Sequence, residues 1–379
     1  MKLLHLSDLH LGKRLIDTSM QEDQEYILNQ IVDIAAAEQP KAVLIAGDVY
    51  DRSNPSAEAM AMFGDFVHKL AALGCAVMVI SGNHDSADRV AYMGALLKER
   101  KVYMSPVYKG SIEPVPLDDE YGPVDFFLMP FIHPEMARQS FPDEKIENAN
   151  DAARLVIGAM QVDPARRNVI LSHQCVLGSA FDEREQRFVG TLDNVDPAIY
   201  DPFDYVALGH IHRAQSIGRE TLRYCGTPLK YSKKEALTQK SVTRVTLGRK
   251  GDIKIDEIPL KPLREVRHVK GLFEDLREKG PEPGMEDDYY FITLTDDTDP
   301  PHAAAQLRAR YKNMLALDYD NSRTRAGSSV TIDGQDDLEE RTPMELLAEL
   351  YRKMHDCDMS DEARAFAESV IAEMEGFEA

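Results

Sequence analysis

The sequence of 379 residues contains no tryptophan, and its four cysteines are too far apart to form a CxxC pair. This spacing predicts neither a zinc knuckle nor a framework of disulfides. No apolar run approaches the roughly 20 residues that a membrane-spanning helix needs. The first residues also lack the charged and apolar regions of a secretory signal. We therefore predict a cytoplasmic protein with no membrane segment. The hydrophobic share of 43% is ordinary for a globular chain, and the length favours more than one domain.

Basic residues are in deficit, with 44 Lys and Arg against 65 Asp and Glu and a formal net charge of -21. This balance disfavours the simplest kind of nucleic-acid binder, because phosphate contacts need Lys and Arg. About half of the acidic excess lies in residues 336–379, which contain 14 acidic and four basic residues. Such a tail is either a solvated surface or a segment that binds a partner, and composition alone does not separate the two.

Short apolar runs, most of them followed by polar or glycine residues, recur through the first 250 residues. Runs this short, flanked by Gly, Pro and Asp, predict buried strands rather than helices. Helical periodicities lie between them, so the pattern predicts an α/β core. The predicted strands are residues 3–6, 42–46, 76–80, 126–129, 169–171 and 205–208, followed by a hairpin over 241–258.

The composition changes near residues 259–262, which contain two prolines. We predict a first domain over residues 1–260 and a small α+β domain over 263–334, whose βαβαβ pattern would end in a strand at 329–332. A helical segment over 341–379 is predicted to begin at a capping box, Thr342 to Glu345. Two short amphipathic helices cannot bury both of their apolar faces against each other, so this segment needs a surface on which to dock.

Five of the six predicted strands end in residue types that bind metal ions. Alternate residues of DxH and HxH point the same way in extended chain, and glycine lets the backbone approach an ion closely. A mixture of carboxylate, imidazole and amide suits Mn²⁺, Fe²⁺ or Zn²⁺. One such motif alone is weak evidence, but the ordered set at strand ends predicts a single metal centre. The segments are 7–10 (SDLH), 47–48 (GD), 82–85 (GNHD), 173 (H) and 209–212 (GHIH).

This ordered set resembles the signature of the calcineurin-like metallophosphoesterases, whose fold is a four-layer αββα sandwich. The resemblance implies that Asp8, His10 and His212 hold one divalent ion and that Asn83, His173 and His210 hold the other, with Asp48 bridging both. Two ions, expected to be Mn²⁺, would activate a water for in-line attack on phosphorus.

The same resemblance implies a catalytic role for the histidine that follows Asn83. His84 would donate a proton to the leaving oxygen. Asp51, three residues after the bridging Asp48, would hydrogen-bond His84 and raise its pKa.

Four segments narrow the resemblance to the SbcD family of nuclease subunits: 1–12 (MKLLHLSDLHLG), 47–51 (GDVYD), 207–215 (ALGHIHRAQ) and 224–232 (YCGTPLKYS). The chain departs from the related archaeal and eukaryotic nucleases at Asp51, where those proteins carry histidine. The resemblance implies a DNA substrate, with exonuclease action on double-stranded ends and endonuclease action on single-stranded or hairpin DNA. The resemblance also implies that the protein acts in DNA repair, recombination and replication.

The family's assembly would also account for the later segments. Residues 263–334 would form a capping domain, and the helices of 341–379 would dock on an SbcC-type ABC ATPase in a heterotetramer that contains a homodimer of this chain. The chain has no Walker A motif, so ATP dependence would come from that partner. Helices over 57–73 and 90–98 are candidates for the homodimer interface. Candidate DNA contacts next to the ligand motifs are Lys13, Arg14, Arg52, Arg89 and Arg213.

Two other functions fit the same fold. The chain could be a phosphodiesterase for a small substrate such as a cyclic nucleotide, or a scaffold without catalysis. The capping domain and tail favour the nuclease, since a small substrate needs neither. A scaffold usually loses metal ligands, whereas all seven and His84 are present here. Protein phosphatases have GNHE where this chain has GNHD, which disfavours that relationship.

Overall fold

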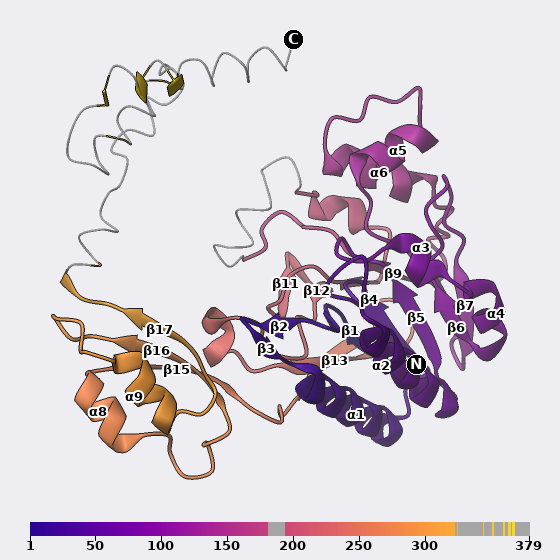
Figure 1. Cartoon of the computed structure of the whole chain (residues 1–379). Helices are drawn as coiled ribbons and strands as arrows, with labels where there is room; N and C mark the ends of the chain where they lie inside the picture. Colours follow the sequence, from indigo (N-terminus) through magenta and orange to yellow (C-terminus); the bar gives the residue numbers. More distant parts are fainter. Residues whose placement is uncertain are drawn as a thin grey trace. The chain divides into compact units, whose positions relative to one another are not determined.

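Two six-stranded mixed sheets form the larger part of the protein (Figure 1). The computed structural model describes residues 1–180 and 194–322, together with a few isolated residues after them. The first sheet has the order β14-β13-β1-β4-β5-β6. Its strands are β1 (Lys2–Leu6), β4 (Ala42–Ala46), β5 (Ala76–Ile80), β6 (Val102–Met104), β13 (Ser241–Leu247) and β14 (Ile253–Pro259).

The second sheet has the order β11-β12-β10-β9-β8-β7. Strands β8, β9, β10 and β12 run parallel to one another within it, and the two edge strands pair antiparallel. Its strands are β7 (Val115–Asp119), β8 (Gly122–Leu128), β9 (Arg167–Ser172), β10 (Tyr205–Leu208), β11 (Gln215–Ile217) and β12 (Arg219–Tyr224).

Side-chain alternation explains why the two sheets stack. In β1, Leu3 belongs to a buried cluster that also contains Phe126 and Leu171 of the second sheet, so these residues fill the space between the sheets. Leu4 and Leu6 point the other way and join a second cluster under the helices. Successive residues of a strand face opposite sides, so an uninterrupted apolar run is needed where both faces are covered.

Helices cover the outer face of each sheet and complete four layers. The first sheet is covered by α1 (Gln21–Glu38) and α2 (Ala57–Ala72). The second is covered by α5 (Pro134–Ser140), α6 (Ala149–Ala159) and the short η3 (Pro197–Tyr200). Three shorter helices, α3 (Ala87–Ala91), α4 (Gly94–Leu97) and η1 (Lys98–Arg100), connect β5 to β6. The predicted αββα sandwich is therefore the fold of this part of the chain.

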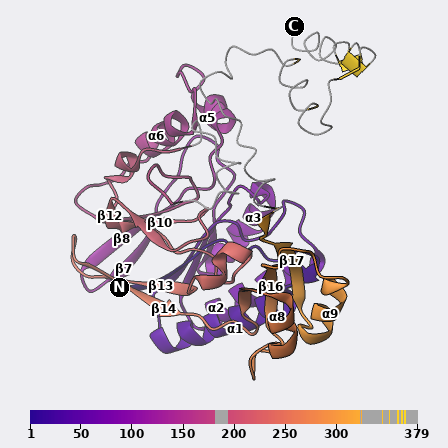
Figure 2. The same ribbon diagram turned by 90° about the vertical axis from the view of Figure 1, so that its left-hand side faces the viewer.

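A small third sheet follows the core. It has the parallel order β15-β16-β17, with β15 (Val266–Gly271), β16 (Tyr289–Leu294) and β17 (Met314–Tyr319). One face packs against α8 (Phe273–Lys279) and α9 (Ala303–Arg310). Tyr289 and Phe291 on the opposite face belong to the cluster under α1 and α2, so this sheet packs on the core. Figure 2 shows α8 and α9 on the outer side of the sheet.

The strands predicted within residues 1–294 are present, with bounds that agree within a few residues, but the sequence pattern does not predict β6, β7, β11, β12 or β17. All five lie at or next to a sheet edge, where burial is incomplete and the apolar run is broken. In the small domain the third strand is β17. The strand predicted at 329–332 and the helices predicted over 341–379 lie almost entirely outside the described residues.

Three of the four cysteines, Cys75, Cys175 and Cys225, are buried, and Cys357 lies outside the described residues. Within the described part of the chain, no helix combines the length and the apolar character that crossing a membrane requires.

His5 is a fully buried imidazole between the two sheets. Its Nε2 lies 3.2 Å from the carbonyl oxygen of Leu208, which can only accept, so Nε2 carries the hydrogen. Its Nδ1 then accepts from the hydroxyl of Tyr205 at 2.9 Å. Burial, with a smaller contribution from the positive charge of Arg223, lowers the pKa of His5 to about 3.

Replacing His5 with glutamine should make the protein less sensitive to acid. A folded-state pKa of about 3 against 6.5 in the unfolded chain means that the unfolded state binds the extra proton, so His5 removes stability as the pH falls from 6.5. The loss is at most about 1.4 kcal/mol per pH unit. Denaturant unfolding at about pH 7 and about pH 4.5 measures it. A constant stability difference between His5→Gln and the unaltered chain across this range would contradict the prediction.

Candidate metal centre

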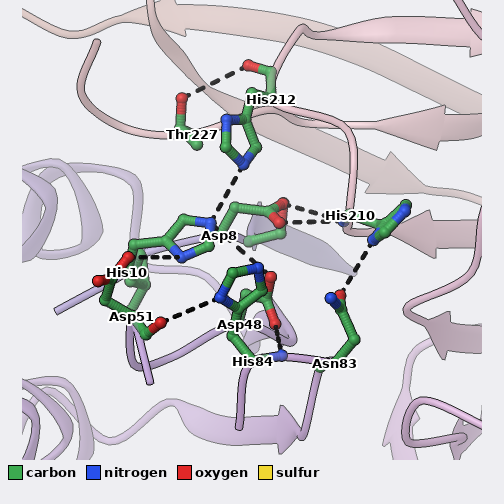
Figure 3. Close-up of polar contacts among 12 residues, drawn as sticks. Asp8, His10, Asp48, Asp51, Asn83, His84, His210, His212 and Thr227 are labelled. Atoms are coloured by element: carbon green, nitrogen blue, oxygen red, sulfur yellow. Dashed lines mark hydrogen bonds and ion pairs between the residues drawn. The ribbon is translucent and has the colours of Figure 1, made fainter. Parts of the chain in front are cut away.

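The predicted ligand residues converge at one place, where strands of both sheets end (Figure 3). Asp8 and His10 follow β1, Asp48 follows β4 and Asn83 follows β5. From the second sheet, His173 follows β9, and His210 and His212 follow β10. Neighbouring parallel strands end at the same edge of a sheet, and the two sheets are stacked, so residues up to 204 positions apart in the sequence meet here.

The backbone at several of these residues is in the left-handed region. Asp8, His10 and Asp48 have φ angles of 53°, 45° and 49°, and His210 has a φ of 102°. Such conformations are uncommon for residues other than glycine and cluster at functional sites. Hydrogen bonds hold them: the amide of Asp8 donates to the Gly47 carbonyl at 2.9 Å, and the amide of His10 donates to the Asp48 carbonyl at 3.0 Å.

Three glycines make the close approach of the loops possible. A Cβ on Gly47 would lie 2.8 Å from Cγ of His173, and a Cβ on Gly82 would overlap the carboxylate of Asp48. At Gly209 a Cβ would overlap the carbonyl oxygen of Ala46 and lie 2.7 Å from Nδ1 of His173. The Ala46 carbonyl is part of the backbone and the His173 ring is buried, so neither can move aside at little cost.

The variant Gly209→Ala should lose metal binding and be destabilised by about 1–3 kcal/mol, because the added methyl group pushes the second sheet away from Ala46 and His173. Thermal unfolding and metal analysis of the purified variant measure both effects. Gly158→Ala is the matched control, since a Cβ at this helical position would have nothing within 4 Å. We expect that control to be neutral or slightly stabilised. Normal metal content in Gly209→Ala would contradict the argument.

Asp8, His10 and His212 form one group of potential ligands. The Nε2 atoms of His10 and His212 are 3.1 Å apart. Two ligands about 2.1 Å from one ion and about 90–110° apart are separated by about 3.0–3.4 Å, so this spacing suits a shared ion. Nδ1 of His10 is buried and has no hydrogen-bond partner among the described residues.

Asn83, His173 and His210 form the other group. Oδ1 of Asn83 lies 3.1 Å from Nε2 of His173 and 3.1 Å from Nδ1 of His210. Nδ1 of His173 donates to the Ala46 carbonyl at 2.8 Å, which leaves Nε2 as the nitrogen that faces the site. Such a hydrogen bond on the far nitrogen is the usual support of a metal-bound imidazole.

Asp48 lies between the two groups. Its Oδ2 is 3.7 Å from Nε2 of His10 and 3.4 Å from Nε2 of His173, and its Oδ1 accepts from the amide of His84 at 2.9 Å. Asp8, Asp48 and His173 also have ligand atoms within 4.8 Å of one another. Asp48 is therefore the carboxylate that can reach ions in both groups.

The electrostatics of the cluster favour a bound cation. Burial raises the pKa of Asp8, and the negative charge of Asp48 acts in the same direction. Burial opposes the charged form of His173 as well, but Asp48 and Asp8 outweigh it and raise the pKa of His173 to about 9. Burial lowers the pKa values of His10 and His210, that of His210 to about 3. The neutral rings of His10 and His210 supply lone pairs, and a divalent ion would replace the proton that the two carboxylates favour on His173.

His84 lies at the exposed side of the site, and Asp51 is its hydrogen-bond partner, as predicted. Nδ1 of His84 is 3.0 Å from the backbone carbonyl oxygen of Asp51 (Figure 3). The carboxylate of Asp51 pairs instead with Nζ of Lys13 at 2.7 Å. The sequence did not indicate that the contact is made by the backbone, because the lysine that takes the carboxylate is 38 positions away.

Asp85 has a role that the sequence alone did not assign. Its carboxylate accepts from the amide of Gly82 at 2.9 Å, from that of Val49 at 3.1 Å and from that of Tyr50 at 2.9 Å. It thereby joins the loops that carry Asp48 and Asn83. Burial and the nearby charge of Asp48 raise its pKa to about 6. In the sequence, its position as the fourth residue of the GNHD motif was the feature that could have indicated this role.

The five candidate DNA contacts differ in their partners, except that Lys13 and Arg52 both pair with the carboxylate of Asp51. Arg52 is 81% exposed, and Arg213 is exposed beside His212. Arg89 donates to the side chain of Asn54, and Arg14 donates to the carbonyl of Asp17. Lys13 is half-buried in its pair with Asp51. Arg14, Arg52, Arg89 and Arg213 are thus exposed, and Lys13 is the one of the five that is partly buried.

Comparisons with known proteins place the chain in a family. Residues 1–214 match the calcineurin-like phosphoesterase family. Residues 262–355 match a family described as the type 5 capsule protein repressor C-terminal domain. The chain is 30% identical over 367 residues to the SbcD subunit of the SbcCD nuclease of Staphylococcus epidermidis, with 95% of each chain covered. A solved dimetal phosphatase from Danio rerio is 12% identical, with a TM-score of 0.41 over 68% of this chain and 95% of that one.

Proposed function

Because the chain belongs to the calcineurin-like phosphoesterases and, among them, to the SbcD family, we propose that this metal-dependent phosphoesterase is a DNA nuclease. The observation that carries the proposal is the convergence of two ligand groups on Asp48, with His84 at the open side. A site for two ions suits an in-line displacement at phosphorus. The relative from Staphylococcus epidermidis, similar over 95% of both chains, supports DNA as the substrate.

The ligand roles follow from the two groups. Asp8, His10 and His212 would hold one ion, Asn83, His173 and His210 would hold the other, and Asp48 would serve both. Two Mn²⁺ ions, when bound, lower the pKa of the attacking water and stabilise charge on the attacking and leaving oxygens. The protein keeps the ligands in place through the Ala46 carbonyl behind His173 and the strained loops at Asp8 and Asp48.

His84 supplies the proton in this mechanism. Its Nδ1 faces the carbonyl of Asp51, which can only accept, so Nδ1 carries a hydrogen in both charge states. Nε2 is therefore the atom that gives and regains the proton, at the leaving oxygen of the phosphodiester. His84 is exposed, so it can reach a bound substrate from the open side of the site. Asp51 acts through its backbone carbonyl, and its carboxylate keeps Lys13 at the rim.

The remaining parts of the chain fit a nuclease that works with a partner. Residues 1–260 are the nuclease domain, 263–334 a capping domain and 341–379 the segment that docks on an SbcC-type ABC ATPase in a heterotetramer. The acidic tail and the absence of a Walker A motif support this division, since the partner would supply ATP hydrolysis and much of the positive charge that DNA requires. Exonuclease action on duplex ends and endonuclease action on hairpins belong to that complex.

A homodimer forms through the segment after His84 and the neighbouring α2. Tyr92, Met93 and Leu96, around α3 and α4, are 72%, 50% and 63% exposed, and Met60 on α2 is 44% exposed. A group of exposed apolar side chains of this size is typical of an interface. Sedimentation of the full chain tests it: a dimer is expected, and a monomer at micromolar concentrations would contradict it.

Hydrolysis of DNA in the presence of Mn²⁺ tests the proposed function. Linear duplex DNA and bis-p-nitrophenyl phosphate are offered to the full chain, alone and with the ATPase partner and ATP. We expect both substrates to be cleaved and DNA degradation to increase with the partner. Cleavage of the small diester alone under all conditions would instead support a small-substrate phosphodiesterase. If the chain cleaved neither substrate, the result would support a scaffold without catalysis.

A further inference from the structure

A buried ion pair lies directly behind His212. Glu235 is in the short helix η4 (Lys233–Leu237), and Lys240 immediately precedes β13. Their exposed fractions are only 7% and 6%, although both carry charges. Nζ of Lys240 and Oε2 of Glu235 are 3.2 Å apart. Burying two charges is unfavourable unless both have well-placed partners, so the contacts of this pair indicate what it stabilises.

Lys240 is bonded to the backbone of His212. Its Nζ donates to the carbonyl oxygen of His212 at 2.9 Å and to Oγ1 of Thr227 at 2.7 Å, and the third donor faces Glu235. Thr227 in turn contacts the same His212 carbonyl at 3.5 Å (Figure 3). All three hydrogens of the ammonium group therefore have acceptors. One acceptor is the His212 carbonyl, and another is Thr227, which itself contacts that carbonyl.

Glu235 faces the ring of the same histidine. Its Oε1 lies 3.5 Å from Nδ1 of His212, while its Oε2 accepts from the amide of Tyr231 at 2.9 Å. The opposite nitrogen of the ring, Nε2, is the one that lies 3.1 Å from Nε2 of His10. A carboxylate at Nδ1 favours the tautomer with the hydrogen on Nδ1, which directs the lone pair of Nε2 into the metal centre.

The imidazole of His173 is held differently. It is oriented by a neutral backbone carbonyl, that of Ala46. His212 has instead a charged group at its far nitrogen and a second charged group on its carbonyl. A carboxylate behind an imidazole makes the ring a stronger donor to a metal than a neutral acceptor does.

We propose that Glu235 and Lys240 are positioning residues that fix His212 at its ring and its backbone and so set the affinity of the ion shared with Asp8 and His10. This inference rests on the proposed role of His212 as a ligand. The pair belongs to the loop between β12 and β13, which also contacts β15 of the small domain through η4. That loop is therefore part of the metal centre.

Calorimetric titration of the metal-free full chain with Mn²⁺ tests the proposal. The unaltered chain is expected to bind two equivalents, and His212→Ala identifies the equivalent held by Asp8 and His10. In Glu235→Gln that same equivalent should weaken by about ten- to a hundredfold while the other keeps its affinity. Because this variant leaves a buried lysine without its anion, the double variant Glu235→Gln, Lys240→Met is made as well, and we expect the same selective loss.

The matched control is Glu265→Gln. Glu265 forms a nearby ion pair with Lys230 at 2.7 Å, and neither residue belongs to the two ligand groups. Its metal affinities should equal those of the unaltered chain. A merely structural role for the pair of Glu235 and Lys240 would lower the unfolding temperature without changing either affinity. Two unchanged affinities, or equal weakening of both, in whichever variant folds would overturn the inference. An unaltered chain that bound no Mn²⁺ would overturn the proposed function and the inference with it.

Discussion

Replacing His84 with alanine is expected to slow phosphodiester hydrolysis by about 10²- to 10⁴-fold while both Mn²⁺ ions remain bound. His84 lies at the edge of the cluster. It is exposed, and its imidazole donates to the Asp51 carbonyl. A ring nitrogen of His84 also lies within 4.8 Å of ligand atoms of His10 and Asp48, so metal content has to be measured together with activity. The amide of His84 donates to Asp48, and the substitution leaves that backbone contact unchanged. Removing the ring therefore removes the proton donor and little else.

The measurement combines two assays on one preparation of the variant. Initial rates on bis-p-nitrophenyl phosphate and on linear duplex DNA should both fall, because the leaving oxygen needs a proton in each. Metal content after gel filtration should equal that of the unaltered chain. His133→Ala is the matched control, an exposed histidine whose ring nitrogen caps α5 rather than facing the site, and it should keep full activity. If His84→Ala lost one or both ions, His84 would be a ligand and not the proton donor.

Replacing Asp48 with asparagine should release both ions and lower the hydrolysis rate by roughly 10³-fold or more, since the ions contribute several kcal/mol to the transition state. The amide has the same size as the carboxylate and can still accept from the amide of His84. It cannot supply negative charge to two ions at once. Because Asp48 lies within 3.7 Å of His10 and 3.4 Å of His173, its charge is the one that both groups share.

Stability separates this effect from simple unfolding. In the unaltered chain, Mn²⁺ should raise the unfolding temperature, because a ligand that binds only the folded state stabilises it. In Asp48→Asn the metal-free protein should remain folded, and the Mn²⁺-dependent rise should disappear. Asp256→Asn, at a partly exposed pair with Arg244 outside both ligand groups, is the control and should keep the rise. Two tightly bound ions in Asp48→Asn would show that the groups do not depend on a bridging carboxylate.

The correspondence between sequence and structure is closest for the central strands. The apolar runs predict strands at residues 42–46, 76–80 and 205–208, and β4, β5 and β10 have these bounds. Each is covered on both faces, so every residue must be apolar and the run is visible in the sequence. The ligand residues follow these strands directly, which is why their gathering could also be predicted from the sequence.

Edge elements and long-range pairings are less visible in the sequence. β6 and β7 are short edge strands, and their apolar pattern is interrupted. The small domain's third strand, β17, has the mixed sequence MLALDY, and the apolar pattern does not predict it. The strand predicted at 329–332 lies outside the described residues. The edge of a sheet needs only alternate apolar residues, so neither its position nor its partner follows from composition.

The local sequence pattern predicts an α/β core with candidate metal ligands at its strand ends, because buried strands and the loops after them are visible in the sequence, and the family resemblance implies the αββα arrangement. The atoms that support these residues follow from the tertiary structure. The Asp51 carboxylate pairs with Lys13, so His84 is held by a backbone carbonyl instead. Glu235 and Lys240 lie behind His212, more than twenty positions from it in the sequence. Such contacts join residues that no periodicity links, and they are settled only when the two sheets pack face to face.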